Sequence, residues 1–268
     1  IGYPDNYTFP EITPISEGGS LFSNTLSVKR HYVSELIRCN EEKEFIRTKM
    51  YMSPDMVNAC FLPELNTINI PAGILNEPFY DRDASYATNL GAIGMIIAHE
   101  MGHSFDKEGA KYDENGCLKN WWTEEDRARV EERTKVMEEY FNAIEVAPGV
   151  YANGKFTLGE NIADHGGLQV AYQAFQNAQK AAIGNGQSAI GVVDGLTPEQ
   201  RFFLAYANVW AGNIRPEEVL QRTKSDPHSL GMWRVNGALP HIGAWYEAWN
   251  VTEESPMYLA PEKRVSIW

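Results

Sequence analysis

The stretch HEMGH, residues 99–103, decides how this sequence is interpreted, because it can place two imidazoles and a carboxylate around one metal ion. Residues four positions apart lie on the same face of an α-helix, so His99 and His103 can both bind one Zn²⁺ through nitrogen. Glu100 stands beside the first ligand, where it can take a proton from a zinc-bound water. The apolar run over residues 89–98 is typical of a buried helix. The motif also arises by chance, so a third ligand is needed to support a catalytic site.

The segment LGENIADHGG, residues 158–167, holds the best candidate for that ligand. Glu160 and Asp164 are four positions apart at the start of a second predicted helix, so they share a face. Glu160 can bind zinc directly, and Asp164 can accept the N–H of a zinc-binding imidazole and so fix its orientation. Asp106, three residues after His103, can do the same for the other imidazole. Glu160 and Asp164 could instead form a solvated acidic face, but the neighbouring HExxH motif favours the metal site.

These two motifs closely resemble those of the neprilysin family of zinc endopeptidases, family M13, which includes the bacterial PepO enzymes. Three further blocks agree in the family's order, and they are VNA at 57–59 with PAGIL at 71–75, DPHSLGMWRVNG at 226–237, and RVSIW at 264–268. The resemblance extends over nearly the whole chain. It implies one zincin (thermolysin-like) catalytic domain over residues 1–268, mainly α with a small β-sheet.

The resemblance also implies a catalytic apparatus. It implies one zinc ion per chain and three protein ligands, which are His99, His103 and Glu160. Glu100 is expected to be the general base that acts on a zinc-activated water, with Asp164 among the catalytic side chains. His228 is expected to donate to the oxyanion, and Arg234 to bind a backbone carbonyl of the substrate. Without the surrounding block, either residue would be read as an ordinary surface or core side chain.

Substrate contacts are expected on both sides of the zinc. Asn58 and Ala59 lie on a presumed edge strand, to which a peptide can add by main-chain hydrogen bonds. The alternative is that Asn58 only satisfies a neighbouring turn. The resemblance places Phe79, Ile96 and Trp210 in an apolar specificity pocket, although buried aromatic residues are ordinarily plain core.

Three departures from the family pattern are visible. Ala211 and Val265 stand where the animal enzymes carry cysteine, which predicts a bacterial form without those disulfides. His165 stands where the family usually has asparagine, which changes the surroundings of the ligands without removing one.

Composition limits the partners. The formal net charge is −13, from 23 basic and 36 acidic residues, so there is no electrostatic case for nucleic acid or an anionic membrane surface, whereas cationic peptides would be attracted. The sequence has no apolar run long enough to span a membrane, and we expect no signal peptide within it. Cys39, Cys60 and Cys117 are widely spaced, so we expect incidental thiols and no disulfide framework.

Family members are longer than this chain and carry a helical N-terminal region that roofs the active site. This chain, which begins at Ile1, is expected to be a trimmed or processed C-terminal catalytic portion. The roof would belong to the same precursor or to a second chain. The expected substrates are oligopeptides, cleaved on the amino side of hydrophobic residues. The expected location is extracytoplasmic (periplasmic, lipoprotein-anchored or secreted), with the bacterial cytoplasm left open.

The predicted elements are mostly helices, and we find no internal repeat. Helices are expected over 21–47, 87–104, 123–142, 160–183, 197–210, 216–224 and 237–249. Short β-type runs at 56–61 and 67–70 flank a turn at 63–66 and predict a hairpin. Loops are expected at 112–117 and 184–195.

Two rival functions stay open. The first is a binding module that holds metal and peptide without turnover, against which the presence of Glu100 argues. The second is a purely structural zinc site, which would close the fourth coordination position with protein, and no fourth ligand is evident beside these motifs.

Overall fold

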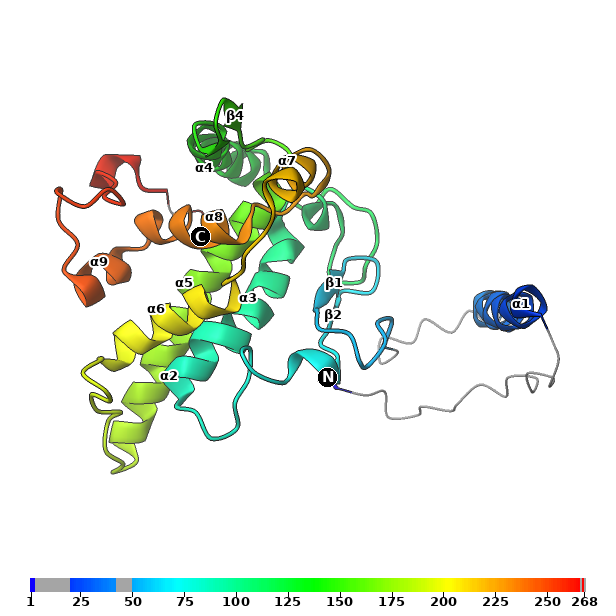
Figure 1. Cartoon of the computed structure of the whole chain (residues 1–268), viewed down its shortest axis with the longest axis horizontal. Coiled ribbons are helices and arrows are strands. Elements are labelled where there is room, and N and C mark those ends of the chain that lie inside the picture. The colour runs from blue at the N-terminus through cyan, green and yellow to red at the C-terminus, as the bar shows by residue number, and fades with distance from the viewer. Residues whose placement is uncertain (3–19, 42–49, 266, 268) are drawn as a thin grey trace.

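The computed structural model describes residues 1–2, 20–41, 50–265 and 267. Part of the helix predicted over 21–47 and part of the closing RVSIW block lie outside the described residues. The helices are α1 (Leu21–Glu41), α2 (Tyr86–Asn89), α3 (Met95–Gly102), α4 (Glu124–Asn142), α5 (Leu158–Gly184), α6 (Pro198–Val209), α7 (Pro216–Ser225), α8 (Gly231–Asn236) and α9 (Gly243–Trp249). Figure 1 shows α1 standing apart from the body that the other helices form.

Two antiparallel hairpins are the sheets of the described chain. The predicted hairpin pairs β1 (Cys60–Leu62) with β2 (Thr67–Asn69), with Cys60 opposite Asn69 and Leu62 opposite Thr67. A second hairpin, which the sequence analysis missed, pairs β3 (Glu145–Ala147) with β4 (Val150–Tyr151). Its turn contains Gly149 at φ +72°, a conformation that suits glycine.

Side-chain caps explain where several helices begin. The Thr123 hydroxyl accepts the backbone N–H of Asp126 at 3.0 Å, which starts α4 where the sequence predicts. Thr197 and Gln200 form a reciprocal capping box at the start of α6. These caps satisfy backbone donors that the first helical turn leaves unpaired.

One continuous helical run carries the HExxH motif. It starts at the Ser85 cap, continues through α2, passes a π-helical turn at Leu90–Gly94 and ends in α3, followed by a 3₁₀ turn at His103–Phe105. This run agrees with the helix predicted over 87–104, but the sequence analysis did not predict the π turn. π turns of this kind are often found at functional sites.

The helix α3 packs directly along α5, which brings the two sequence motifs together (Figure 1). Glycine makes this close approach possible. A Cβ atom added at Gly167 would lie 2.7 Å from the backbone nitrogen of His99. One added at Gly102 would lie 3.2 Å from the Cα of Ala163. Both motifs therefore lie where the backbones of α3 and α5 are in close contact.

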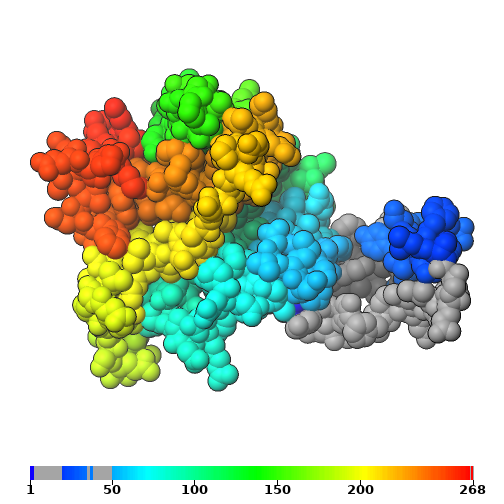
Figure 2. All heavy atoms as spheres, in the orientation of Figure 1, coloured from blue at the N-terminus to red at the C-terminus, as the bar shows by residue number. Residues whose placement is uncertain are grey.

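Two apolar clusters lie on either side of this contact. The larger joins the HExxH helix to α5, α6 and α9, and its buried members include Met95, Leu168, Phe175, Phe202 and Tyr206. Burying a side chain of this kind stabilises the fold by about 1.5–3 kcal/mol. The smaller joins α4 to the start of α5 and the C-terminal segment, through Met137, Phe141, Ile162 and Ile267. In Figure 2 these parts form one continuous body, with α1 to one side.

Two element predictions were wrong in their bounds. The strand predicted over 56–61 begins only at Cys60, so Asn58 and Ala59 lie just before β1 and not on it. The helix predicted over 237–249 begins only at Gly243, as α9, because a 3₁₀ turn containing Pro240 occupies its first part, and α8 was not predicted from the sequence. Proline lacks the N–H that an α-helix would need there.

Among the described residues, no helix is both long and apolar enough to cross a membrane. Among the side chains that the structure describes, those of Cys60 and Cys117 are free thiols.

Candidate metal centre and cleft

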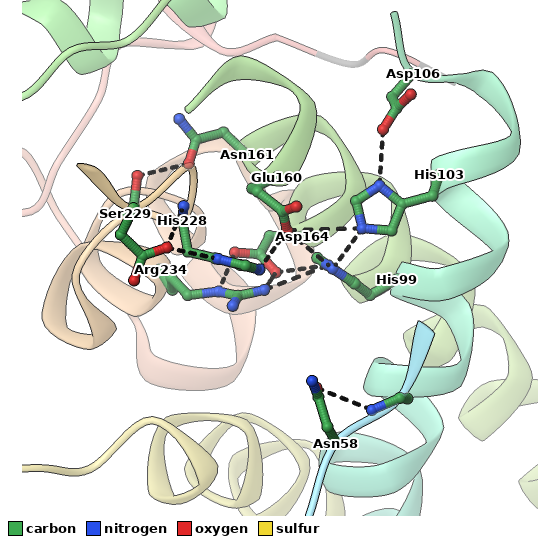
Figure 3. A network of polar contacts seen from close by, with 12 residues as sticks. Asn58, His99, His103, Asp106, Glu160, Asn161, Asp164, His228, Ser229 and Arg234 are labelled. Carbon is green, nitrogen blue, oxygen red and sulfur yellow. Dashed lines mark hydrogen bonds and ion pairs between the residues drawn. The ribbon is translucent and has the colours of Figure 1, made fainter. Parts of the chain in front are cut away.

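The two histidines of the motif converge on one point. His99 lies in α3 and His103 directly after it, and their Nε2 atoms are 3.0 Å apart. Glu160, in the first turn of α5, brings its Oε2 atom to 3.3 Å from Nε2 of His99 and 3.6 Å from Nε2 of His103. Figure 3 shows the three side chains pointing toward one another. The structure therefore brings together the three residues that the sequence analysis predicted as ligands.

A carboxylate behind each imidazole fixes its orientation. Nδ1 of His99 lies 2.8 Å from Oδ1 of Asp164, and Nδ1 of His103 lies 2.7 Å from Oδ2 of Asp106. Each Nδ1 can therefore carry the proton and donate a hydrogen bond to the carboxylate. This tautomer leaves a lone pair on Nε2, and the hydrogen bond turns that lone pair toward the other histidine. Two nitrogen lone pairs 3.0 Å apart, beside a third anionic oxygen, suit a cation between them.

The two imidazole nitrogens and the Glu160 carboxylate form a set of donors that fits a zinc ion. Burial alone lowers the pKa of His99, but the hydrogen bond and charge of Asp164 outweigh it and raise the pKa to about 9. The site thus favours a positive charge on this ring, which a divalent cation at Nε2 supplies. Oε2 of Glu160 is buried and makes no hydrogen bond with the described residues, so it too is available as a ligand. Two nitrogens and one carboxylate oxygen are a ligand set typical of catalytic zinc.

The two glutamates of the site differ electrostatically. Glu100 is buried, and that burial raises the pKa of its carboxyl group. Glu160 is also desolvated, but the contact with His99 and the charges of both imidazoles leave its pKa below the ordinary value. A carboxylate oxygen of Glu100 lies within 4.8 Å of ligand nitrogens of both histidines. A group with a raised pKa suits proton transfer, whereas an ionised group suits metal binding.

A buried ion pair supports the site from behind. Arg234, on α8, donates from Nε and Nη2 to the two oxygens of Asp164 at 2.7 and 2.6 Å. Burial alone would raise the pKa of Asp164, but the Arg234 charge and the His99 hydrogen bond hold it well below its usual range. The guanidinium also lies 3.7 Å above the ring of Trp210. Tyr206 donates to the backbone carbonyl of Arg234 at 2.5 Å, which fixes this part of α8.

His228 enters the site from the other side. Its Nε2 atom lies 3.3 Å from Oε2 of Glu160, and its side chain is 41% exposed. Its Nδ1 atom and its backbone N–H both contact Oδ1 of Asp226, at 2.7 and 3.0 Å. Arg222 donates to the other oxygen of Asp226 from Nε and Nη2, at 3.0 and 2.8 Å. His228 is thus held by a chain of charged residues.

The sequence analysis assigned no role to Asp226 or Arg222. The signals were present, since Asp226 precedes His228 by two residues and follows Arg222 by four. An aspartate in that position can bond the backbone two residues later, and an Arg–Asp pair at that spacing is common at the end of a helix. A further contact was not predicted from the sequence. The hydroxyl of Ser229 donates to Oδ1 of Asn161 at 2.7 Å and so connects the loop that carries His228 to α5.

A cleft of about 550 Å³ passes the proposed ligands. The predicted substrate-binding residues all line it, and they are Asn58, Ala59, Phe79, Ile96, Trp210 and Arg234. His228 and Glu100 line the same cleft. In this conformation the side-chain oxygen of Asn58 accepts the N–H of Ala59 at 2.9 Å, so Asn58 satisfies its own turn as well as facing the cleft. The sequence analysis did not single out Cys60, which also lies on the cleft wall.

His165 lies behind the ligands in the interior. It is fully buried, and neither ring nitrogen has a hydrogen-bond partner among the described residues. Its ring packs edge-on against His241, with centroids 6.0 Å apart. Burial lowers the pKa of His165 to about 4 and that of His241 to about 3. The departure at residue 165 therefore places a neutral histidine in the core and removes no ligand.

The helical scaffold, the HExxH helix and the glutamate of a second helix define the class of zincin-like metallopeptidase domains. The predicted fold class, mainly α with small antiparallel sheets, is confirmed. The family model of peptidase family M13 matches residues 58–265. The chain belongs to this family, as the sequence motifs predicted.

Relatives agree with that assignment. Endothelin-converting enzyme 1 of Rattus norvegicus is 40% identical over 222 residues, which cover 83% of this chain and 28% of that protein. Neprilysin of Homo sapiens is 40% identical over 283 residues, which cover 100% of this chain and 36% of that protein. The chain therefore spans about a third of these relatives or less.

Solved structures show the same fold. Zinc metalloprotease Zmp1 of Mycobacterium tuberculosis, in complex with an inhibitor, matches with a TM-score of 0.77 and 41% identity, over 83% of this chain and 34% of that one. PepO from Lactobacillus rhamnosis HN001 matches with a TM-score of 0.71 and 38% identity, over 83% of this chain and 33% of that one.

Proposed function

We propose that this chain is the catalytic portion of a zinc-dependent endopeptidase that hydrolyses oligopeptides on the amino side of hydrophobic residues. The observation that carries the proposal is the convergence of His99, His103 and Glu160, with a carboxylate orienting each imidazole. Family membership supports the same reaction. We assign these three residues as the ligands of one zinc ion, and residues 1–268 as one catalytic unit.

Bound there, zinc would polarise a peptide carbonyl and lower the pKa of an attacking water. Glu100 would take the proton of that water and pass it to the leaving amine, for which its raised pKa is suited. His228 would donate from Nε2 to the oxyanion, with its ring held in place by the contact of Nδ1 with Asp226. Asp164 would keep His99 in position and neutralise the buried Arg234.

The cleft suits an extended peptide. Asn58 and Ala59 lie directly before β1, where a peptide can pair with the main chain. Phe79, Ile96 and Trp210 supply an apolar wall for a hydrophobic side chain. Nε and Nη2 of Arg234 are engaged by Asp164, so Nη1 is the nitrogen that we assign to a substrate carbonyl.

The longer relatives leave room for a second part of the protein. We propose that a helical N-terminal region covers the cleft, in the same precursor or as a separate chain, and limits substrates to oligopeptides. We also propose an extracytoplasmic location, from the family resemblance alone. Cell fractionation with an antibody against this chain tests the location.

The decisive experiment separates zinc binding from chemistry. The purified chain is assayed with internally quenched peptides that carry leucine, phenylalanine or aspartate at one variable position, and mass spectrometry identifies the cleaved bond. Glu100→Gln should keep zinc and lose activity by about 10²–10⁴-fold. Met101→Gln is the matched control, because it places a glutamine on the exposed side of the same turn.

Each rival function predicts a different result. Zinc and peptide binding without hydrolysis by the wild-type chain would favour a binding module. Retention of a tenth or more of the activity in Glu100→Gln would exclude Glu100 as the base. Cleavage after, and not before, hydrophobic residues would refute the proposed specificity alone.

A further inference from the structure

A second cavity, larger than the cleft, lies outside it. It has a volume of about 700 Å³ and lies among the loop after the HExxH helix, residues 118–122, the first half of α4 and the first turns of α5. That volume is within the range of small-molecule sites. It meets the cleft only through Asp106, which lines both. The catalytic proposal gives this cavity no role.

The walls of the cavity are apolar. Leu118, Trp122, Val130, Leu158 and Ile162 line it. Apolar side chains also gather at its edge, where Leu118 is 72% exposed and Trp121 is 40% exposed. Trp121 stacks beside Trp122, with ring centroids 4.7 Å apart. A surface of this kind would gain free energy by taking up an apolar group.

The rim of the cavity is basic, although the chain as a whole is strongly acidic. Four cations line it, and they are Lys107, Lys111, Lys119 and Arg127. The acidic residues of the lining are Asp106 and Glu131. Asp106 is occupied, because it accepts from His103 and from the backbone N–H groups of Glu108 and Gly109. Lys111 pairs with Glu108 and Lys119 lies 3.5 Å from Asp113, whereas Arg127 donates to the neutral side chain of Asn120 and keeps its charge available. With four cations against two carboxylates, the lining is positively charged in a protein whose formal net charge is −13, and Arg127 is the cation best placed to meet an anion.

An unsatisfied donor points to the same kind of ligand. The indole N–H of Trp122 is buried and has no acceptor among the described residues. Buried polar groups in proteins are nearly always hydrogen-bonded, so such a donor calls for a partner. An oxygen atom of a bound carboxylate would supply it, next to the cations of the rim.

We propose that this cavity binds a small amphiphilic carboxylate, with its apolar body against Leu118, Val130 and Ile162 and its head group at the N–H of Trp122 and the cation of Arg127. The apolar walls, the basic rim and the unpaired donor each favour this class of ligand. The proposal does not depend on the peptidase function. The site is separate from the cleft and lies behind the carboxylate that orients His103.

Isothermal titration of the purified chain with decanoate tests the proposal. Decyl maltoside, which has the same apolar chain and a neutral head, is the comparison, and both are used below their micelle concentrations. Decanoate should bind saturably at one site, at least tenfold more tightly than decyl maltoside, and more weakly as salt rises. No saturable binding, or equal affinity for the neutral compound, would overturn the proposal.

Two variants locate the head group. Trp122→Phe removes the N–H and keeps an aromatic ring, and Arg127→Gln removes the cation, so each should weaken decanoate about tenfold. Arg129→Gln is the matched control on the same helix, because Arg129 pairs with Glu125 and does not line the cavity. Trp122→Phe should leave the unfolding temperature unchanged, because its N–H has no described protein partner. Wild-type affinity in both Trp122→Phe and Arg127→Gln would refute the assigned site.

Discussion

Replacing Asp164 by asparagine should separate the stability of the fold from the binding of zinc. The Asp164 carboxylate accepts from Arg234 at 2.7 and 2.6 Å and faces Nδ1 of His99 at 2.8 Å. Asparagine keeps the size but leaves the buried guanidinium without a counter-charge. Removing one partner of a buried ion pair destabilises a protein by about 3–5 kcal/mol. Losing the group that orients a ligand weakens metal binding by about 10–100-fold.

Two measurements distinguish these effects. Urea unfolding in the presence of a chelator gives the free energy of unfolding without metal, and competition with a coloured chelator gives the zinc affinity. Asp106→Asn is the matched control, because Asp106 also orients an imidazole, but its Oδ1 accepts two backbone N–H groups that an amide oxygen can keep. It should lose about 10–100-fold in zinc affinity, while its unfolding free energy changes by only about 1 kcal/mol.

A double variant completes the test and remains informative if Asp164→Asn does not fold. Asp164→Asn with Arg234→Met removes both charges, and replacing both partners of a buried pair is often nearly neutral. Stability should therefore recover toward the wild-type value, while zinc affinity should not. The reasoning is refuted if Asp164→Asn is as stable as Asp106→Asn in chelator, or if the double variant is no more stable than the single one.

Three further predictions follow from the geometry. His228→Phe should lower kcat by about 10²–10³-fold with zinc retained, and near-normal kcat in steady-state assays would exclude the oxyanion role. Gly167→Ala should destabilise the fold by about 1–3 kcal/mol, because the added Cβ would lie 2.7 Å from the His99 nitrogen. Gly184→Ala, in open space at the end of the same helix, should be neutral or stabilising by up to about 1 kcal/mol, and equal unfolding midpoints for the two variants would contradict this account. His165 has its pKa lowered to about 4 in the folded state, so its contribution to stability is present above about pH 6.5 and is lost as pH falls toward 4, by roughly 2–3 kcal/mol between about pH 7 and 4.5. His165→Asn should flatten the pH dependence of the unfolding free energy, and an unchanged slope in urea titrations would refute this prediction.

The sequence was sufficient for the parts of the site that depend on local spacing. His99 and His103 are four residues apart on a helix. Most of the helices can be recognised in the sequence by an N-capping residue or by apolar residues that recur at helical spacing. Glu160 could be proposed because its own helix begins with a recognisable motif. Its distance from the histidines could not be known, because it depends on α3 and α5 packing at Gly102 and Gly167.

Other features are set by tertiary contacts and were missed for that reason. The salt bridge from Arg222 to Asp226 is local, but its importance appears only when His228 is seen beside Glu160. The late start of α9 follows from Pro240 and not from hydrophobic periodicity, and the same periodicity does not mark where β1 begins. The cavity with the basic rim is lined by residues from α4, α5 and two loops, so no single stretch of sequence predicts it.

The π turn at Leu90–Gly94 has a consequence for how this helix can change in length. The part before the turn packs against α6, and the part after it packs against α5. A π-type hydrogen bond spans one residue more than the bond of an α-helix, so this turn accommodates one extra residue. Deleting one residue there would let the turn close as an α-helix and would leave the flanking faces about where they are. The same deletion within α3 would rotate every later residue of the helix by about 100° and turn His103 away from Glu160. Changes in length should therefore be tolerated at the turn and excluded from α3.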